Sequence, residues 1–219
     1  MNQYSQTSLP PRAPKGGRPT QEIAAQLGTH ILEVALEQFI AHGAGGITMD
    51  AIASAAKISK RTLYSRFRSK TELVRSAVEH GVGRLISPIV ALTPCGTLRE
   101  RLFHTGRKFL DTSLMPEVIG MEALIKWLQD NECPMVGAGT MPGISDGVGH
   151  IRSILEDSEL NGSMPEEDMD FFARYIFDSM VTIPRHMILC RRDIRNTAQE
   201  KNQYLDHVLD ILLWGRTAE

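Results

Sequence analysis

The side chains best suited to chemistry lie in the stretch TMDAIASAAKISKRTLYSRFRSK, residues 48–70. Guanidinium, ammonium and hydroxyl groups recur there, and such groups bind phosphate oxygens and the edges of nucleic-acid bases. Residues 57–75 hold seven Lys or Arg and one acid, Glu72. Residues 1–75 carry ten basic and five acidic residues, net +5, whereas residues 76–219 carry fourteen and twenty-one, net −7. One end of a chain with a formal net charge of −2 is therefore predicted to bind a polyanion.

Two short helices separated by a tight turn are predicted to position these groups. Thr48 is a good N-cap for a helix that ends near Ala56, and Ser59 is a good N-cap for a helix over residues 60–67. In the second helix, Leu63 lies on the apolar face. The polar face lies opposite, with Tyr64 and Thr62 at its edges and with Arg61, Ser65 and Arg68 at its centre. This pairing is typical of a helix-turn-helix, whose second helix enters the major groove of DNA.

Longer helices are predicted on both sides of this pair. From Thr20 onward, apolar residues recur at helical spacing as far as Phe39, and Gly43 is the expected C-cap. Ser69 is expected to cap the helix KTELVRSAVEHGVGRL. Glu72 lies in the first turn of that helix, where a negative charge complements the helix dipole.

The rest of the chain is also predicted to form helices, separated by Pro and Gly breaks. No alternating strand pattern of comparable strength and no internal repeat occurs, so the predicted fold class is all-α. Pro184 is expected to kink or end its helix, and residues 133–143 form either a loop or a broken helix. The expected helices span about residues 97–114, 117–131, 145–159, 165–189 and 197–215.

The segment ITMDAIASAAKISKRTLYSRFRSKTELV resembles the DNA-binding signature of the tetracycline-repressor (TetR) family. A helix that begins at a Thr is followed by a short turn and by the pattern T-L-Y-x-x-F-x-x-K. The preceding ILEVALEQFIAHG resembles the first helix of the family, so the resemblance covers about residues 18–80. Family members often carry Gly-Val where this chain has Lys57 and Ile58. We expect Lys57 to adopt the same turn.

The resemblance implies two roles for the polar residues of this segment. Residues that face base edges or the adjoining backbone are Lys60, Arg61, Tyr64 and Ser65, and residues that hold phosphates are Thr48, Thr62, Arg66 and Lys70. Physics also favours Lys70, because a cation beside the backbone amides of a helix N-terminus makes a phosphate site. Arg18, in the basic arm, is expected to enter a minor groove, although the arm could instead serve only solubility.

The resemblance further implies a homodimer whose C-terminal body encloses a small-molecule pocket. The expected domains are a flexible basic arm at 1–19, a three-helix helix-turn-helix DNA-binding domain at 20–68, a connecting helix at 69–84, and a helical effector-binding and dimerisation domain at 85–219. The expected pocket residues are Phe103, Arg107, Met121, Trp127, Phe171 and Tyr175. The expected dimer residues lie in the last two apolar helices: Phe172, Ile176, Ile183, Leu205, Leu209, Leu212 and Leu213.

The expected function is sequence-specific regulation of transcription, by a repressor that a small, largely apolar ligand releases from a palindromic double-stranded DNA operator. Two alternatives stay open: a dimeric DNA-binding regulator without an effector, and a helical enzyme. The sequence contains no GxSxG, P-loop, GxGxxG or HExxH motif, which disfavours the enzyme.

Cysteine usage and hydropathy limit the remaining possibilities. Cys95, Cys133 and Cys190 are widely spaced and odd in number, which predicts neither a disulfide framework nor a metal site, and no cofactor is expected. No window approaches the roughly 18 apolar residues of a membrane span, and the N-terminus lacks the apolar core of a secretion signal. We therefore expect a cytoplasmic protein with no membrane partner.

Overall fold

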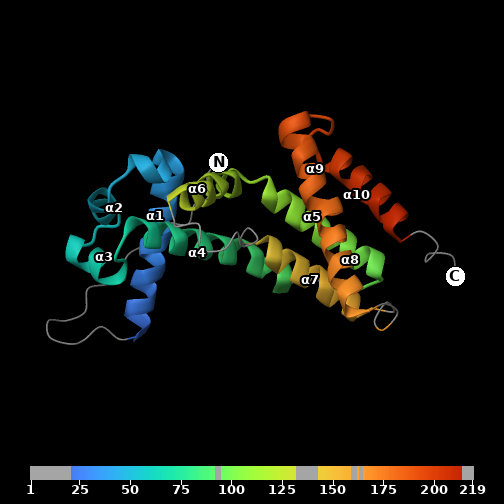
Figure 1. The fold of residues 1–219 in the computed structure, drawn as a ribbon, viewed down its shortest axis with the longest axis horizontal. Coiled ribbons are helices and arrows are strands. Elements are labelled where there is room, and N and C mark those ends of the chain that lie inside the picture. Colours follow the sequence, from blue (N-terminus) through green and yellow to red (C-terminus); the bar gives the residue numbers. More distant parts are fainter. Residues whose placement is uncertain (1–20, 92–94, 132–142, 159–161, 163–164, 214–219) are drawn as a thin grey trace. The chain divides into compact units, whose positions relative to one another are not determined.

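The computed structural model describes residues 21–91, 95–131, 143–158, 162 and 165–213 (Figure 1). Every regular element in these ranges is a helix, so the predicted all-α fold class is confirmed for the described part of the chain. None of the described helices combines the length and apolar content needed to cross a bilayer. The uncertain segment at 133–143 lies outside the described residues, except for Gly143.

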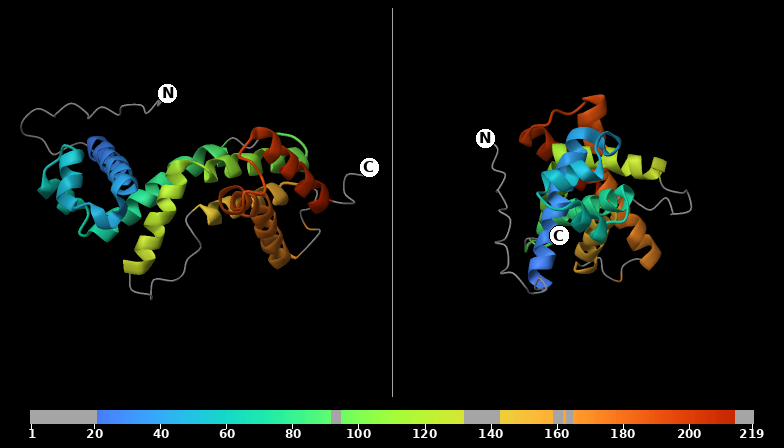
Figure 2. Two further views of the ribbon diagram at one scale, coloured as in Figure 1. Left: turned by 90° about the horizontal axis from the view of Figure 1, so that it is seen from above. Right: turned by 90° about the vertical axis from the view of Figure 1, so that its left-hand side faces the viewer.

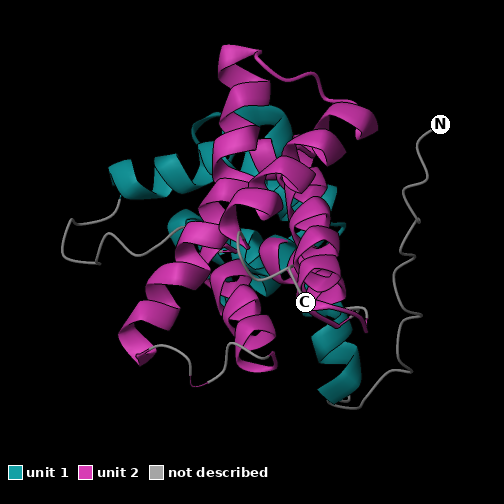
Figure 3. Ribbon diagram, turned by 90° about the vertical axis from the view of Figure 1, so that its right-hand side faces the viewer, with its two compact units in different colours: residues 1–81, 120–138 teal, residues 82–119, 139–219 magenta. Residues whose placement is uncertain are grey.

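The chain divides into two compact units, which Figure 3 distinguishes by colour. Unit 1 comprises residues 1–81 and 120–138, and unit 2 comprises residues 82–119 and 139–219. The boundary therefore falls inside two helices, α4 (Lys70–Ala91) and α6 (Pro116–Asn131). The predicted domains had assigned residues 120–138 entirely to the C-terminal part.

Small residues explain why the first unit includes part of α6. A Cβ atom added to Gly120 would lie 2.7 Å from the side chain of Ile40 in α1, and one added to Gly81 would lie 2.8 Å from Met121 Sδ. Met121 is 1 % exposed. Helix α6 therefore packs directly on the helices of unit 1 at these two glycines, because a larger side chain at either would collide with its neighbour.

Unit 1 begins with α1 (Gln21–Gly46), which continues to Gly46 past a break at Gly43, where φ is 71° and ψ is 151°. The predicted C-cap glycine is thus the point where the helix is interrupted. Helices α2 (Met49–Ala55) and α3 (Lys60–Arg66) follow, and they lie beside α1 in both views of Figure 2. Fully buried side chains from four helices form the core of this unit: Ile31, Ala35, Phe39, Ile52, Ala53, Leu63, Leu73 and Ala77.

Helix α4 confirms the predicted cap and runs further than predicted. The Ser69 hydroxyl accepts from the Glu72 amide at 3.1 Å, and the Glu72 carboxylate accepts from the Arg68 amide at 2.7 Å. The helix then continues past residue 84 to Ala91, with Pro88 inside it. Proline lacks the amide hydrogen, so one hydrogen bond of the last turns is missing without ending the helix.

Unit 2 is built from helices that match the predicted positions closely. Their bounds are α5 (Leu98–Ser113), α7 (Ile144–Glu156), α8 (Glu166–Phe177), η1 (Asp178–Thr182), α9 (Ile183–His186), η2 (Met187–Arg191) and α10 (Ala198–Leu212), together with the first residues of α6. Thr97 and Glu100 form a capping box at the start of α5. The hydrogen bonds from Thr97 lower the pKa of the Glu100 carboxyl.

The single helix predicted over residues 165–189 is instead a series of α and π segments. The π segments η1 and η2 lie on either side of α9, which contains Pro184. In η1 the Ile183 amide donates to the Asp178 carbonyl, five residues back. Pro184 changes the hydrogen-bond register here because it cannot donate, and the helical path ends only at Arg192, whose φ is 60°.

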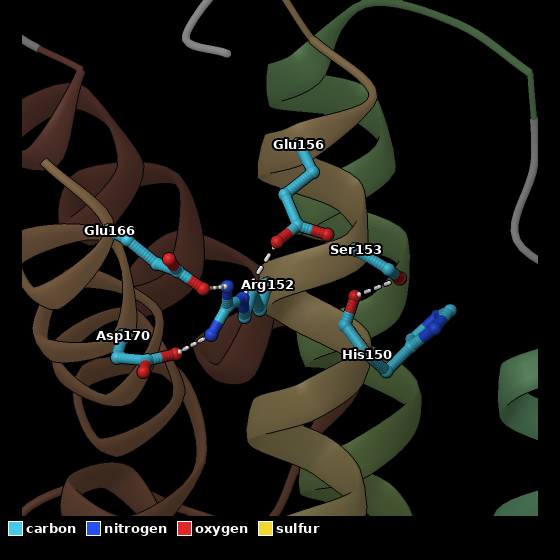
Figure 4. Close-up of polar contacts among 6 residues, drawn as sticks. All are labelled: His150, Arg152, Ser153, Glu156, Glu166 and Asp170. Atoms are coloured by element: carbon cyan, nitrogen blue, oxygen red, sulfur yellow. Dashed lines mark hydrogen bonds and ion pairs between the residues drawn. The ribbon is translucent and has the colours of Figure 1, made fainter. Parts of the chain in front are cut away.

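Two polar clusters join helices within unit 2. Arg152 of α7 donates to Glu156 on its own helix and to Glu166 and Asp170 on α8 (Figure 4), and these bonds raise its guanidinium pKa. Lys201 of α10, which is 7 % exposed, donates to Asp111 of α5 at 2.5 Å. Each cluster fixes the packing of two helices by charge-assisted hydrogen bonds.

Candidate nucleic-acid interface

The turn between α2 and α3 is closed by backbone hydrogen bonds. The Ile58 amide donates to the Ala53 carbonyl at 3.0 Å and the Lys57 amide donates to the Ser54 carbonyl at 3.1 Å. This is the Schellman arrangement, which needs a left-handed residue at its first position after the cap. Lys57 takes that position with a φ of 54°, so the expectation that it adopts the turn is confirmed.

Both predicted N-caps of the helix-turn-helix are present. The Thr48 hydroxyl accepts from the Ala51 amide at 3.2 Å, and the Ser59 hydroxyl accepts from the Thr62 amide at 3.0 Å. Helix α3 ends at Arg66, and Phe67 is its C-cap in an extended conformation. These caps satisfy backbone amides that two helices of seven residues each could not otherwise pair.

Helix α3 has one buried and one exposed face. Leu63 is fully buried, whereas Tyr64 is 49 % exposed and Arg61 and Ser65 are exposed. Ser65 donates its hydroxyl hydrogen to the Thr62 carbonyl at 2.8 Å. The Arg61 guanidinium is exposed and has no hydrogen bond or ion pair within the described ranges, so its N–H donors face solvent.

The four residues assigned to phosphates each have a partner inside unit 1. The Arg66 guanidinium donates to the Ala24 carbonyl at 3.0 Å, and the Lys70 ammonium donates to the Ala44 carbonyl at 2.9 Å. The Thr62 and Ser59 hydroxyls lie 2.8 Å apart, and Thr48 caps α2. Arg66 and Lys70 keep further donors, since guanidinium has five and ammonium three. These contacts fix where the cationic groups stand on the surface.

Lys60 also has a partner, which sequence reasoning missed. Its ammonium lies 2.5 Å from a carboxylate oxygen of Asp50 on α2, and this hydrogen bond raises the pKa of Lys60. The two residues are ten positions apart, so helical spacing does not reveal the pair. The sequence did contain a signal for this pair, because two opposite charges lie at the starts of two helices that a known turn brings together. Arg18, by contrast, lies outside the described residues.

Residues 31–77 match the sequence profile of the family described as "Bacterial regulatory proteins, tetR family". The match spans α2, the turn and α3, together with the second part of α1 and the first part of α4. The chain carries a TetR-family DNA-binding domain. The exposed face of α3 therefore lies within the segment that matches this family, and Leu63 is buried on the opposite face of the helix.

Other known proteins resemble this chain in part of its sequence or in its fold. The chain is 39 % identical over 79 residues to the HTH-type transcriptional regulator Rv1556 of Mycobacterium tuberculosis, a match covering 36 % of this chain and 37 % of the relative. Its fold is similar to that of a TetR-family regulator from Mesorhizobium loti, with a TM-score of 0.74, 22 % identity, and 89 % and 98 % of the two chains covered. It is also similar to the Flavonoid-responsive Regulator FrrA, with a TM-score of 0.65, 19 % identity, and 86 % and 96 % covered.

The six predicted pocket residues are divided between the two units, and their part in a pocket stays a prediction. Met121 and Trp127 belong to unit 1, and Phe171 and Tyr175 are 71 % and 51 % exposed with their rings stacked at 6.4 Å. Phe103 is half-buried against the unit 2 core, and Arg107 pairs with Asp111 at 2.8 Å. The aromatic residues of α8 lie on the surface because α8 buries its opposite face, which includes Met169, Ala173, Ile176 and Phe177.

Unit 2 nevertheless contains an open cleft of about 680 Å³ between the second half of α4 and α7. Its walls combine apolar and hydroxyl groups with one carboxylate and one imidazole: Gly83, Ile86, Ser87, Val90, Ala91, Ser145, Asp146, Gly149, His150 and Ser153. Burial, and then the charge of Arg101, lower the pKa of His150, which favours its neutral form. No residue named for the pocket in the sequence prediction lines this cleft.

The predicted dimer residues are mostly internal to one chain. Ile176, Leu205 and Leu209 are fully buried, Leu213 is 4 % exposed, and Phe172 and Leu212 pack partly against the same core. Ile183, at 48 % exposed, is the predicted dimer residue that lies most on the surface. The wide apolar stripes on these helices were interpreted as an excess over what one core needs, but that core uses them. Other apolar side chains on the same helices are exposed instead: Phe171, Tyr175, Leu189 and Ile211.

No group of three or more His, Cys, Asp or Glu side chains in the described ranges is arranged to hold a metal ion. Cys95 and Cys190 are exposed free thiols, and Cys133 lies outside those ranges. The relatives named above are described as transcriptional regulators, which favours the predicted regulator over the enzyme alternative.

Proposed function

We propose that this chain is a sequence-specific DNA-binding regulator of transcription that inserts α3 into the major groove. One observation carries the proposal: a capped recognition helix, anchored through Leu63, presents Arg61, Tyr64 and Ser65 to solvent within a TetR-family domain. Arginine forks to guanine O6 and N7, and hydroxyl groups bond either base edge. Arg66 and Lys70, held by backbone carbonyls of α1, are placed to contact phosphates.

Repression is the mode of regulation that we propose, because a bound protein blocks a promoter without further contacts. We also propose that two copies of the chain bind a palindrome whose half-sites lie about 34 to 36 Å apart, one turn of DNA. The exposed apolar side chains of α8 to α10 support contact with a second copy, since Phe171, Tyr175, Ile183 and Ile211 would leave water in such a contact.

Two substitutions separate base reading from phosphate binding. Full-length protein first selects duplexes from a random pool, and affinities are then measured for the selected duplex and a shuffled one. Arg61→Ala is expected to lose about 1–3 kcal/mol of discrimination at particular base pairs. Lys70→Ala is expected to weaken binding to both duplexes by the same factor. It should also reduce the slope of log affinity against log salt by about one.

Controls make the comparison specific. Lys108 is an exposed lysine on α5, and Lys108→Ala should leave both affinities unchanged. The free energy of unfolding is measured for each variant, because Lys70 also bonds the Ala44 carbonyl. Equal effects of Arg61→Ala and Lys70→Ala on the two duplexes would refute the role assignment, and a selected pool without a palindrome would refute the two-copy arrangement.

We propose further that a small, largely apolar ligand occupies the cleft between α4 and α7 and releases the DNA. The volume of about 680 Å³ lies within the usual range for ligand sites. Ile86, Val90 and Ala91 offer apolar contacts, while the hydroxyls of Ser145 and Ser153 offer hydrogen bonds. FrrA is described as flavonoid-responsive, and flavonoids combine aromatic rings with hydroxyl groups, so they are the first compounds to test.

Filling the cleft tests the ligand proposal without disturbing the fold. A Cβ atom at Gly149 would meet nothing within 4 Å, so Gly149→Leu should fill the cleft and also favour the helix by about 0.5–1 kcal/mol. We expect a flavonoid to raise the thermal unfolding midpoint of the wild type and of Gly149→Ala, but not of Gly149→Leu. A shift that survives in Gly149→Leu would place the ligand elsewhere, and no shift in any protein would remove flavonoids as effectors.

A further inference from the structure

Asp50 is the one acidic residue in the basic stretch 48–70, and it pairs with a residue of the recognition helix. It is the second residue of α2, and Lys60 is the first residue of α3. The carboxylate and the ammonium lie 2.5 Å apart, with side chains that are 46 % and 67 % exposed. The pair therefore bridges the turn of the helix-turn-helix at its surface.

The helix dipole stabilises one of these two charges and destabilises the other. A carboxylate in the first turn of α2 is favourable, because the N-terminus of a helix carries partial positive charge. An ammonium at the first position of α3 is unfavourable for the same reason. The negative charge of Asp50 therefore offsets the unfavourable interaction between the Lys60 ammonium and the N-terminus of α3.

The same place is where a recognition helix reads DNA. The N-terminal residues of such a helix contact base edges in the major groove, so the proposed function would place Lys60, and with it Asp50, beside a bound duplex. A lysine that is free to move would reach a phosphate on any DNA sequence, because the backbone is the same everywhere. A carboxylate at this place is repelled by phosphates and competes with them for the ammonium.

We propose that Asp50 is a specificity-determining residue that holds the Lys60 ammonium against α2 and so weakens binding to DNA of unrelated sequence. The inference rests on the proposed function. The pair is exposed, and exposed pairs exchange readily. Lys60 therefore leaves Asp50 when a duplex presents well-placed base acceptors, such as guanine O6 and N7, at this point of the groove. Asp50 acts through Lys60 and is a positioning residue.

Removing the carboxylate charge should release the lysine. Asp50→Asn is expected to tighten binding of the full-length protein to a shuffled duplex about tenfold at 0.1 M salt, and to steepen the slope of log affinity against log salt by about 0.9, the value of one added phosphate contact. Binding to the selected duplex should tighten less. The ratio of the two affinities should therefore fall severalfold.

Three further variants separate this role from a general charge effect. Glu79→Gln removes one negative charge from an exposed site on α4 and should leave the salt slope unchanged. Asp50→Glu should restore the wild-type slope, because it keeps the carboxylate within reach of Lys60. Adding Lys60→Gln to Asp50→Asn should cancel the steeper slope, since no lysine is then released.

The outcomes distinguish this inference from the proposed function. If the wild type binds the selected and the shuffled duplex with equal affinity, the proposed function is wrong. If the wild type keeps that preference while Asp50→Asn leaves the slope unchanged, the pair is only a surface ion pair and the inference is wrong. Weaker binding of Asp50→Asn to the selected duplex alone would also overturn it, because Asp50 would then accept directly from a cytosine amino group.

Discussion

Leu63→Ala should destabilise the DNA-binding domain by about 2–5 kcal/mol and reduce DNA affinity at least tenfold. Leu63 is the one buried residue of α3, and its side chain is fully excluded from solvent. A helix of seven residues is too short to persist alone in water, so α3 depends on this contact for its position and its structure. The free energy of unfolding from urea titration and the affinity for the selected duplex check the prediction together.

A volume-conserving substitution provides the control for this experiment. Leu63→Met should cost less than about 1.5 kcal/mol and should retain DNA binding, since it refills the same space. If Leu63→Ala unfolds at the same urea concentration as the wild type, α3 is held by contacts other than Leu63. If it unfolds earlier but binds the duplex with unchanged affinity, α3 is not the reading element.

Asp111→Ala should destabilise the chain by about 2–3 kcal/mol, whereas Lys201→Met should cost less than about 1 kcal/mol. Asp111 accepts from Lys201 at 2.5 Å and from Arg107 at 2.8 Å. Removing the carboxylate leaves two cations together, and one of them is 7 % exposed. Removing Lys201 leaves Asp111 still paired with Arg107. Breaking a fully buried ion pair destabilises a protein by about 3–5 kcal/mol. We expect a smaller loss here because the Asp111 side chain is 44 % exposed.

Thermal and urea unfolding of both variants measure this asymmetry. A further variant, Asp111→Asn, keeps the shape of the side chain and removes its charge, so it separates electrostatics from packing. The account expects Asp111→Asn to lose most of what Asp111→Ala loses. A larger cost for Lys201→Met than for Asp111→Ala would show that packing of the lysine stem dominates over the charge pair.

Local rules predicted the helix-turn-helix with high fidelity. The hydroxyls of Thr48, Ser59 and Ser69 each accept a hydrogen bond from the amide three residues ahead, so both partners of each cap lie within a short stretch of sequence. The turn is equally local, because Lys57 needs only a left-handed conformation. The burial of Leu63 opposite Arg61 follows from helical geometry alone. The roles of the exposed residues toward bases and phosphates stay predictions.

Features that depend on tertiary packing were less accessible. Ile176, Leu205 and Leu209 were predicted for a dimer contact, but they fill the core of one chain, because an apolar stripe has the same pattern in both cases. Phe171 and Tyr175 are aromatic residues on the exposed face of α8, and no local signal distinguishes that face from a pocket wall.

Long-range pairs were missed for the same physical reason. Asp50 and Lys60 are joined only when the turn brings two helix starts together, and their spacing of ten residues matches no helical period. The contact of α6 with unit 1 depends on Gly81 and Gly120, whose small size matters only when a neighbour is present. Such contacts are properties of the packed structure rather than of any one segment.

The most direct test of the central claim is the ratio of affinities of the full-length wild type for the selected and the shuffled duplex at two salt concentrations. The account predicts a ratio of at least about 10³, with both affinities falling as salt rises because phosphate-bound counterions are released. A ratio near one at moderate salt would contradict it, since α3 would then bind the DNA backbone without reading its sequence.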